Sequence, residues 1–143
     1  MKVKDNKQNG KISLAPQKAL EKLCFGFEFL SHNGHYGLKV LEKNKNADAC
    51  ISLLEKLQEL SKIDIVTAHA FGKKRGMEKI PIKQLNEDAQ KVCLNSGIVT
   101  NDSKITIFRF GSQDYRIIGK DDVNTPNLIH IIGFDGDFSA YDH

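Results

Sequence analysis

The chain has 143 residues, of which 40% are hydrophobic and 27% are charged, as in a folded globular protein rather than a fibrous or low-complexity one. Its 21 lysines and arginines against 18 aspartates and glutamates give a net charge of +3, which permits nucleic-acid binding without demanding it. Its three cysteines lack a Cys-x-x-Cys spacing, which excludes a disulfide framework and a structural zinc site and favours a reducing compartment.

Secretion and membrane insertion are not expected from the sequence. The first ten residues are polar, and no run along the chain approaches the roughly 20 apolar residues that span a bilayer. The sequence therefore predicts a cytoplasmic protein with no membrane partner, and it leaves the oligomeric state open.

The N-terminal third predicts a tail, a short helix and a hairpin. Residues 1–14 carry few apolar anchors and predict a flexible tail before a single domain over residues 15–143. Pro16 suits the first turn of a short helix that continues to Leu23, because its fixed φ is already helical. Beyond it, aromatic and alternating runs flank Asn33-Gly34, which predicts a β-hairpin over about residues 24–41.

Residues 47–62 predict an amphipathic helix. Its apolar residues recur at spacings of three and four, with charged residues on the opposite side; they are Cys50, Leu53, Leu54, Leu57 and Leu60. The run at residues 63–67 either extends this helix or begins a strand, and both alternatives stay open.

Residues 71–85 are basic and punctuated by glycine. Pro81 argues against a helix here, so we expect a loop. Its candidate nucleic-acid-binding residues are Lys73, Lys74, Arg75, Lys79 and Lys83. One short helical turn is expected over residues 86–94.

Three alternating runs, at residues 104–110, 114–119 and 128–135, predict C-terminal strands. Together with the preceding elements they predict an α+β domain. We expect its helices to pack on one face of a mainly antiparallel sheet that is completed by this three-stranded meander.

Several of these features occur together in a known family. They are the leucine-rich helix over residues 53–60, the basic glycine-containing loop, the strands with Phe108-Arg109-Phe110 and Tyr115-Arg116-Ile117-Ile118, and a last strand leading toward Tyr141. From Leu53 to the C-terminus the chain thereby resembles the RelE/ParE-type toxins, small bacterial proteins in which one or two helices precede a curved antiparallel sheet.

The resemblance implies an endoribonuclease or ribosome-associated toxin that cleaves RNA by attack of the 2′-OH, without a metal or other cofactor. Its partners would be RNA or the ribosome, and an antitoxin protein. Carried over by position, Arg109 and Arg116 would bind phosphate, and His130, Tyr141 or His143 would transfer protons. Guanidinium groups match phosphate oxygens, and imidazole both takes and gives protons near neutral pH.

Other interpretations of the same residues stay open. Arginines on half-exposed strands commonly pair with a cross-strand carboxylate, and Asp114, Asp121, Asp122 and Asp135 are available as partners. In this second interpretation, the sheet has no catalytic role and the chain is a nucleic-acid-binding module that uses residues 73–83. A third alternative is a protein-interaction or phage-defence accessory domain that docks through Phe25, Phe27, Phe29 and Tyr36.

Overall fold

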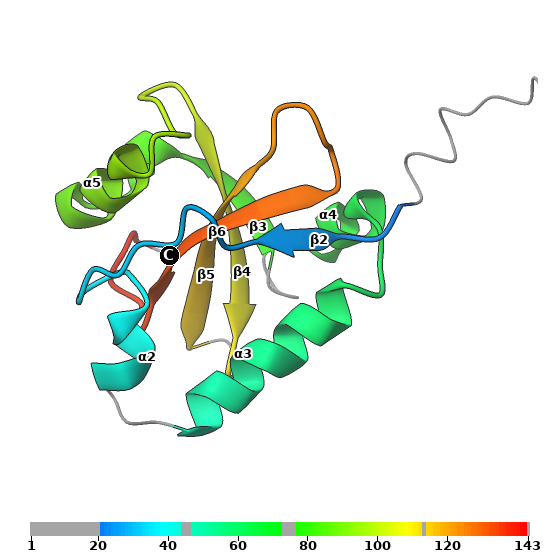
Figure 1. Cartoon of the computed structure of the whole chain (residues 1–143), viewed down its shortest axis with the longest axis horizontal. Helices are drawn as coiled ribbons and strands as arrows, with labels where there is room; N and C mark the ends of the chain where they lie inside the picture. Colours follow the sequence, from blue (N-terminus) through cyan, green and yellow to red (C-terminus); the bar gives the residue numbers. More distant parts are fainter. Residues whose placement is uncertain (1–20, 44–46, 73–76, 113, 143) are drawn as a thin grey trace, which may run out of the picture.

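The computed structural model describes residues 21–43, 47–72, 77–112 and 114–142. It shows an α+β fold, as predicted, with helices packed on a mixed sheet (Figure 1). The elements in chain order are β2 (Cys24–Gly26), α2 (Lys39–Lys43), α3 (Ala47–Leu60), α4 (Ile65–Phe71), β3 (Met77–Pro81), a 3-10 turn (Ile82–Gln84), α5 (Glu87–Asn95), β4 (Lys104–Phe110), β5 (Tyr115–Asp121) and β6 (Leu128–Asp135).

The five strands lie in the order β2-β6-β5-β4-β3. The pairs β3–β4, β4–β5 and β5–β6 are antiparallel, which confirms the predicted C-terminal meander, whereas β2 is parallel to β6. The register of β5 against β6 shifts between Ile118 and Gly119. Strand β3 therefore forms one edge of the sheet and the short β2 forms the other.

The predicted hairpin over residues 24–41 is wrong. The Asn33 side chain does form a turn, because its Oδ1 accepts the N–H groups of His35 at 2.7 Å and Tyr36 at 3.1 Å. However, the chain then enters α2 instead of returning as a strand, and β2 pairs with β6. The local turn signal was sound, but the long-range pairing with β6 determined the strand partner.

Two further segments differ from expectation. Residues 21–23, at the end of the predicted first helix, are not helical, and Lys22 instead forms a β-bridge with Asp64. Residues 1–20, which include the predicted tail and the start of that helix, lie outside the described residues. Part of the predicted basic loop is strand β3, and Pro81 is tolerated at its end because β3 is an edge strand.

Helix α3 confirms the amphipathic helix predicted over residues 47–62, and α5 is a nine-residue helix where one short turn was expected. The open question at residues 63–67 is resolved as a separate helix, α4, which begins after Asp64. The Asp64 side chain accepts the N–H of Thr67 at 2.8 Å and so caps the helix. That hydrogen bond is the main reason why the pKa of Asp64 lies below its usual value.

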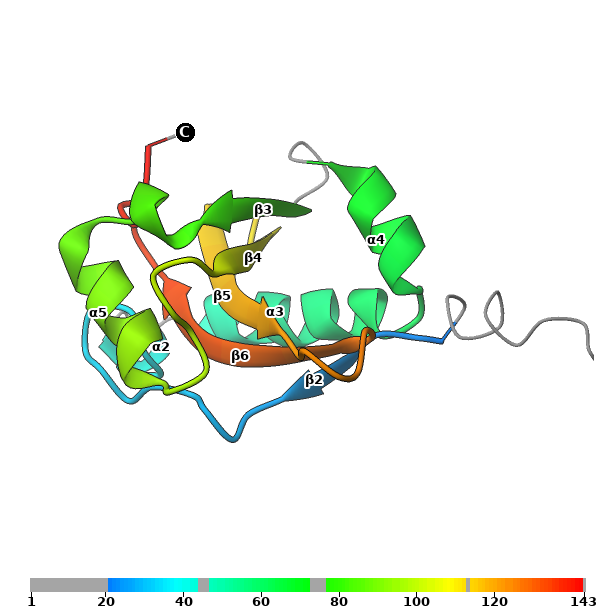
Figure 2. The same ribbon diagram turned by 90° about the horizontal axis from the view of Figure 1, so that it is seen from above.

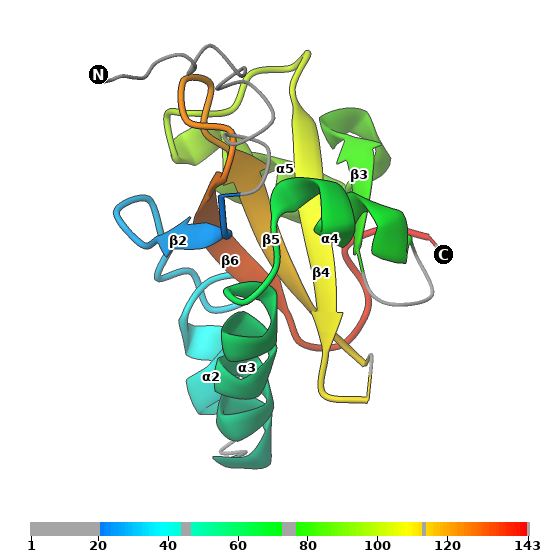
Figure 3. The ribbon, with the colours of Figure 1, turned by 90° about the vertical axis from the view of Figure 1, so that its right-hand side faces the viewer.

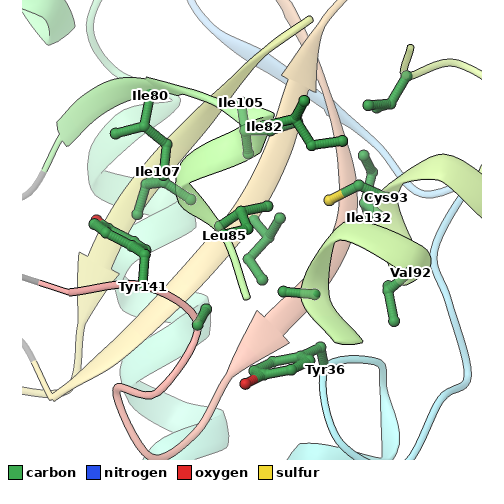
Figure 4. Packing of buried hydrophobic residues seen from close by; sticks show 14 residues of the cluster. Tyr36, Ile80, Ile82, Leu85, Val92, Cys93, Ile105, Ile107, Ile132 and Tyr141 are labelled. Carbon is green, nitrogen blue, oxygen red and sulfur yellow. The ribbon is translucent and has the colours of Figure 1, made fainter. Parts of the chain in front are cut away.

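Helices cover both faces of the sheet, not one as expected. Strand β4 alternates between two buried clusters, as a strand must when both of its faces are covered. One cluster joins the sheet to α5 and includes Ile105, Ile107, Ile118, Val92 and Cys93 (Figure 4). The other joins it to α3 and α4 and includes Phe108, Ile117, Ile131, Leu60 and Ala68.

Helices α5 and α4 lie at opposite ends of the molecule (Figures 1 and 2), and α4 passes in front of β4 in the view of Figure 3. The face of the sheet that packs against α5 also carries Arg109 and Arg116, the two arginines predicted to bind phosphate. These arginines and His130 lie on strands of the meander, whereas Tyr141 lies beyond it.

Candidate functional site

Arg109 and Arg116 are direct cross-strand neighbours on β4 and β5. Arg116 is completely buried, and its Nη1 lies 3.1 Å from Oδ2 of Asp135, whose side chain is also completely buried. Asp135 is opposite Arg116 in the β5–β6 register. The expectation that an arginine of this sheet pairs with a cross-strand carboxylate is therefore confirmed for Arg116.

Two aromatic rings enclose the Arg116 guanidinium. Its Cζ lies 3.6 Å from the ring centroid of Phe138 and 3.8 Å from that of Tyr141, where the ring quadrupole attracts a cation. No part of Arg116 reaches solvent. In this conformation, then, a phosphate group cannot contact the arginine that the family resemblance assigns to phosphate binding.

Residues 136–142, which we call the C-terminal segment, are held by Asp135. Its carboxylate accepts the backbone N–H groups of Asp137, Ser139 and Ala140 at 3.3, 3.1 and 2.9 Å. The same carboxylate pairs with Arg116. The Arg116–Asp135 pair therefore joins β5, β6 and the C-terminal segment, which is a structural role.

Arg109 and Tyr141 both contact Glu78 on β3. Nη2 of Arg109 lies 3.9 Å from Oε2 of Glu78, and the Tyr141 hydroxyl donates to the same oxygen. Burial, and then the hydrogen bond to Glu78, raises the pKa of Tyr141. The Tyr141 hydroxyl thus stays protonated at neutral pH and is a weaker acid than a free phenol, which does not favour the predicted proton transfer.

His130 lies away from the arginines. It is opposite Lys120, four residues along β5 from Arg116, a separation of about 13 Å in a strand that rises about 3.3 Å per residue. Its Nε2 lies 2.8 Å from Oδ1 of Asp122, and this hydrogen bond is the largest cause of the lowered pKa of Asp122. The arginines and this imidazole therefore do not converge on one phosphodiester, and His143 lies outside the described residues.

The five candidate nucleic-acid-binding residues of the basic segment divide into three groups. Lys73, Lys74 and Arg75 lie outside the described residues. Lys79 lies on β3, with its Nζ 2.7 Å from Oδ2 of Asp121. Lys83 follows in the 3-10 turn and is exposed.

A further lysine, Lys104 at the start of β4, belongs with these residues. It is exposed and lies opposite Pro81 in the β3–β4 register, while Lys79 lies opposite Thr106. The backbone N–H of Ile82 donates to Ser103 at 3.1 Å, which brings the turn that carries Lys83 beside the start of β4. We call Lys79, Lys83 and Lys104 the lysine edge.

The lysine edge is only partly neutralised. Asp121 pairs with Lys79 and also accepts the Thr106 hydroxyl at 2.6 Å. Within the part of the chain that the structure describes, neither Lys83 nor Lys104 has a carboxylate within ion-pair distance. Two exposed ammonium groups thus remain available at one edge of the sheet.

The sequence missed Lys104 and Glu78 as residues of these sites. Each becomes relevant through the pairing of β3 with β4, and that stretch was expected to be a loop. The lysine next to the Ile-Thr-Ile-Phe run was a usable signal for Lys104, but only once the neighbouring strand was known.

Among the described residues, no group of three or more His, Cys, Asp or Glu side chains is arranged to hold a metal ion. Nor is any helix in the described ranges long and apolar enough to cross a membrane. Comparisons with protein-family models, with curated proteins and with solved structures found no match. Any function must therefore be inferred from the geometry of the chain.

Proposed function

We propose that this protein binds the phosphate backbone of RNA through the lysine edge. The observation that carries the proposal is the placement of Lys83, in the turn after β3, near the start of β4 that carries Lys104; both are exposed and neither is in an ion pair among the described residues. Exposed ammonium groups attract phosphates, and their binding is favoured by release of the counterions that surround a nucleic acid.

The sequence before β3 supports the same ligand. The run Lys73-Lys74-Arg75 adds three cationic residues to the same basic stretch of sequence, residues 71–85. A lysine ammonium group attracts phosphate as a point charge and carries no information on base sequence, so we expect contacts to phosphate rather than to a base sequence.

Cleavage of the bound RNA stays a prediction that the geometry does not favour. Both predicted arginines and His130 have a carboxylate partner: Arg116 has Asp135, Arg109 has Glu78 and His130 has Asp122. A carboxylate beside a phosphate site repels the substrate that the cation attracts. We therefore propose binding as the function and treat cleavage as an outcome to be measured.

The test is the salt dependence of binding to a fluorescent single-stranded RNA, followed by anisotropy. We expect the double variant Lys83→Gln/Lys104→Gln to bind more weakly and to lower the slope of log K against log salt by about 1.4, because each lost contact with a single strand removes about 0.7. Gel electrophoresis of the same samples reports cleavage.

The matched control is Lys39→Gln/Lys91→Gln, which removes the same charge from exposed positions on α2 and α5. If both double variants weaken binding equally, only net charge matters and the lysine edge is not the site. If wild type shortens the RNA and Arg109→Gln does not, the ribonuclease prediction is restored.

A further inference from the structure

A groove runs along both sides of Phe29, on the segment that follows β2. Two cavities of about 320 and 270 Å³ share Glu28 and Phe29 as lining residues. The larger is bordered by Lys120, Asp122 and His130 at the β5–β6 end of the sheet, and the smaller by the C-terminal end of α5. We call the two together the Phe29 groove.

The larger cavity is of a size for one ligand side chain, at the lower limit of the about 300–1,000 Å³ typical of binding pockets. Its wall is fixed, because the ring of Phe29 packs perpendicular to that of His130 with the centroids 5.1 Å apart. Phe29 is half-buried, so part of its surface remains available to a ligand.

The charged groups of the groove favour a cationic ligand. The carboxylate of Glu28 is exposed, and that of Asp122 retains 24% of its side-chain surface while it pairs with His130. Against these, Lys120 carries the one ammonium group among the described residues of the lining, and its Nζ already donates to the backbone oxygen of Asp121 at 2.9 Å. Asp121, which pairs with Lys79, also lines this cavity, so the lining carries three carboxylates and one ammonium.

We propose that the Phe29 groove binds the arginine or lysine side chain of a partner peptide. The cationic end would lie against Phe29, whose ring attracts a cation, and would pair with Glu28. Asp122 adds negative charge nearby, but its Oδ1 already pairs with His130 and its Oδ2 accepts the backbone N–H groups of Asn124 and Thr125. Arginine is favoured over lysine because its planar guanidinium can stack on a ring and pair with a carboxylate at once. The site adjoins the lysine edge, because Asp121 lines the larger cavity and also pairs with Lys79, but the proposal does not depend on RNA binding.

The test is an amide NMR titration of the ¹⁵N-labelled protein with three blocked tripeptides, Gly-Arg-Gly, Gly-Leu-Gly and Gly-Glu-Gly. We expect Gly-Arg-Gly to shift the amides of Glu28, Phe29 and His130 more than the other two do. The variant Glu28→Gln should weaken that binding about two- to fivefold, as expected for a partly exposed ion pair. The equally exposed Glu42→Gln on α2 should leave it unchanged.

Three outcomes overturn the proposal. They are equal shifts with the glutamate peptide, shifts of the arginine peptide that map elsewhere, and identical affinities for wild type and Glu28→Gln. Because Glu28 is exposed, a failure of that variant to fold is not expected, and its spectrum checks this directly.

Discussion

Replacing Asp135 by alanine is expected to lower the free energy of unfolding by about 3–5 kcal/mol, the usual cost of removing one partner from a buried ion pair. The reason is specific to this site. Nε and Nη2 of Arg116 have no hydrogen-bond partner within the described ranges, so Asp135 is the carboxylate on which the buried guanidinium depends. The substitution also removes the acceptor of the Asp137 and Ala140 backbone N–H groups and leaves the Ser139 N–H only its contact with Asp137 Oδ1 at 3.2 Å.

Urea denaturation followed by circular dichroism measures this loss. Asp102→Ala, in an exposed turn, removes the same charge and is expected to change stability by no more than about 0.5 kcal/mol. Equal stability of the two variants would contradict the structural role of the Arg116–Asp135 pair. It would mean that Arg116 is solvated, and the phosphate-binding role implied by the family resemblance would regain support.

Replacing Gly133 by alanine is expected to cost about 3 kcal/mol, at the upper end of the usual penalty for overpacking. A Cβ at this position would lie 1.9 Å from the backbone oxygen of Tyr36, which is not free to move aside. That oxygen accepts the N–H of Phe134 at 2.7 Å and so attaches the segment after β2 to β6. Relief of the clash therefore requires this attachment to break.

Gly34→Ala is the matched control, because a Cβ there would meet nothing within 4 Å. We expect it to be neutral or slightly stabilising, since alanine restricts the unfolded chain. Thermal unfolding of the two variants compares them directly. A Gly133→Ala protein as stable as Gly34→Ala would show that the segment over residues 31–37 does not lie against β6 as described.

Local patterns predicted the periodic elements well. The three- and four-residue spacing of Leu53, Leu57 and Leu60 identified α3, and alternation identified β4, β5 and β6, because each element carries its own burial pattern in its sequence. The failures were long-range. Nothing in the segment over residues 24–41 indicates that β2 pairs in parallel with a strand a hundred residues later.

The same difference between local and long-range information applies to the candidate site. Residue type marked Arg109, Arg116 and His130 as chemically capable, but register decided their surroundings: Arg116 is opposite Asp135, and His130 is opposite Lys120. A strand sequence carries little information on register where both faces are buried, because alternation along the strand is then weak. The lysine edge could not be predicted from the sequence either, because Lys104 comes near Lys83 only through the pairing of β3 with β4.

The location of bound RNA on the surface tests the proposed function most directly. An amide NMR titration of the ¹⁵N-labelled protein with a short single-stranded RNA is expected to shift resonances of Lys79, Lys83 and Lys104, and to lose these shifts at high salt. Shifts centred instead on Arg109 and Tyr141, or on the Phe29 groove, would contradict binding through the lysine edge. An unchanged spectrum at low salt would remove the proposed function altogether.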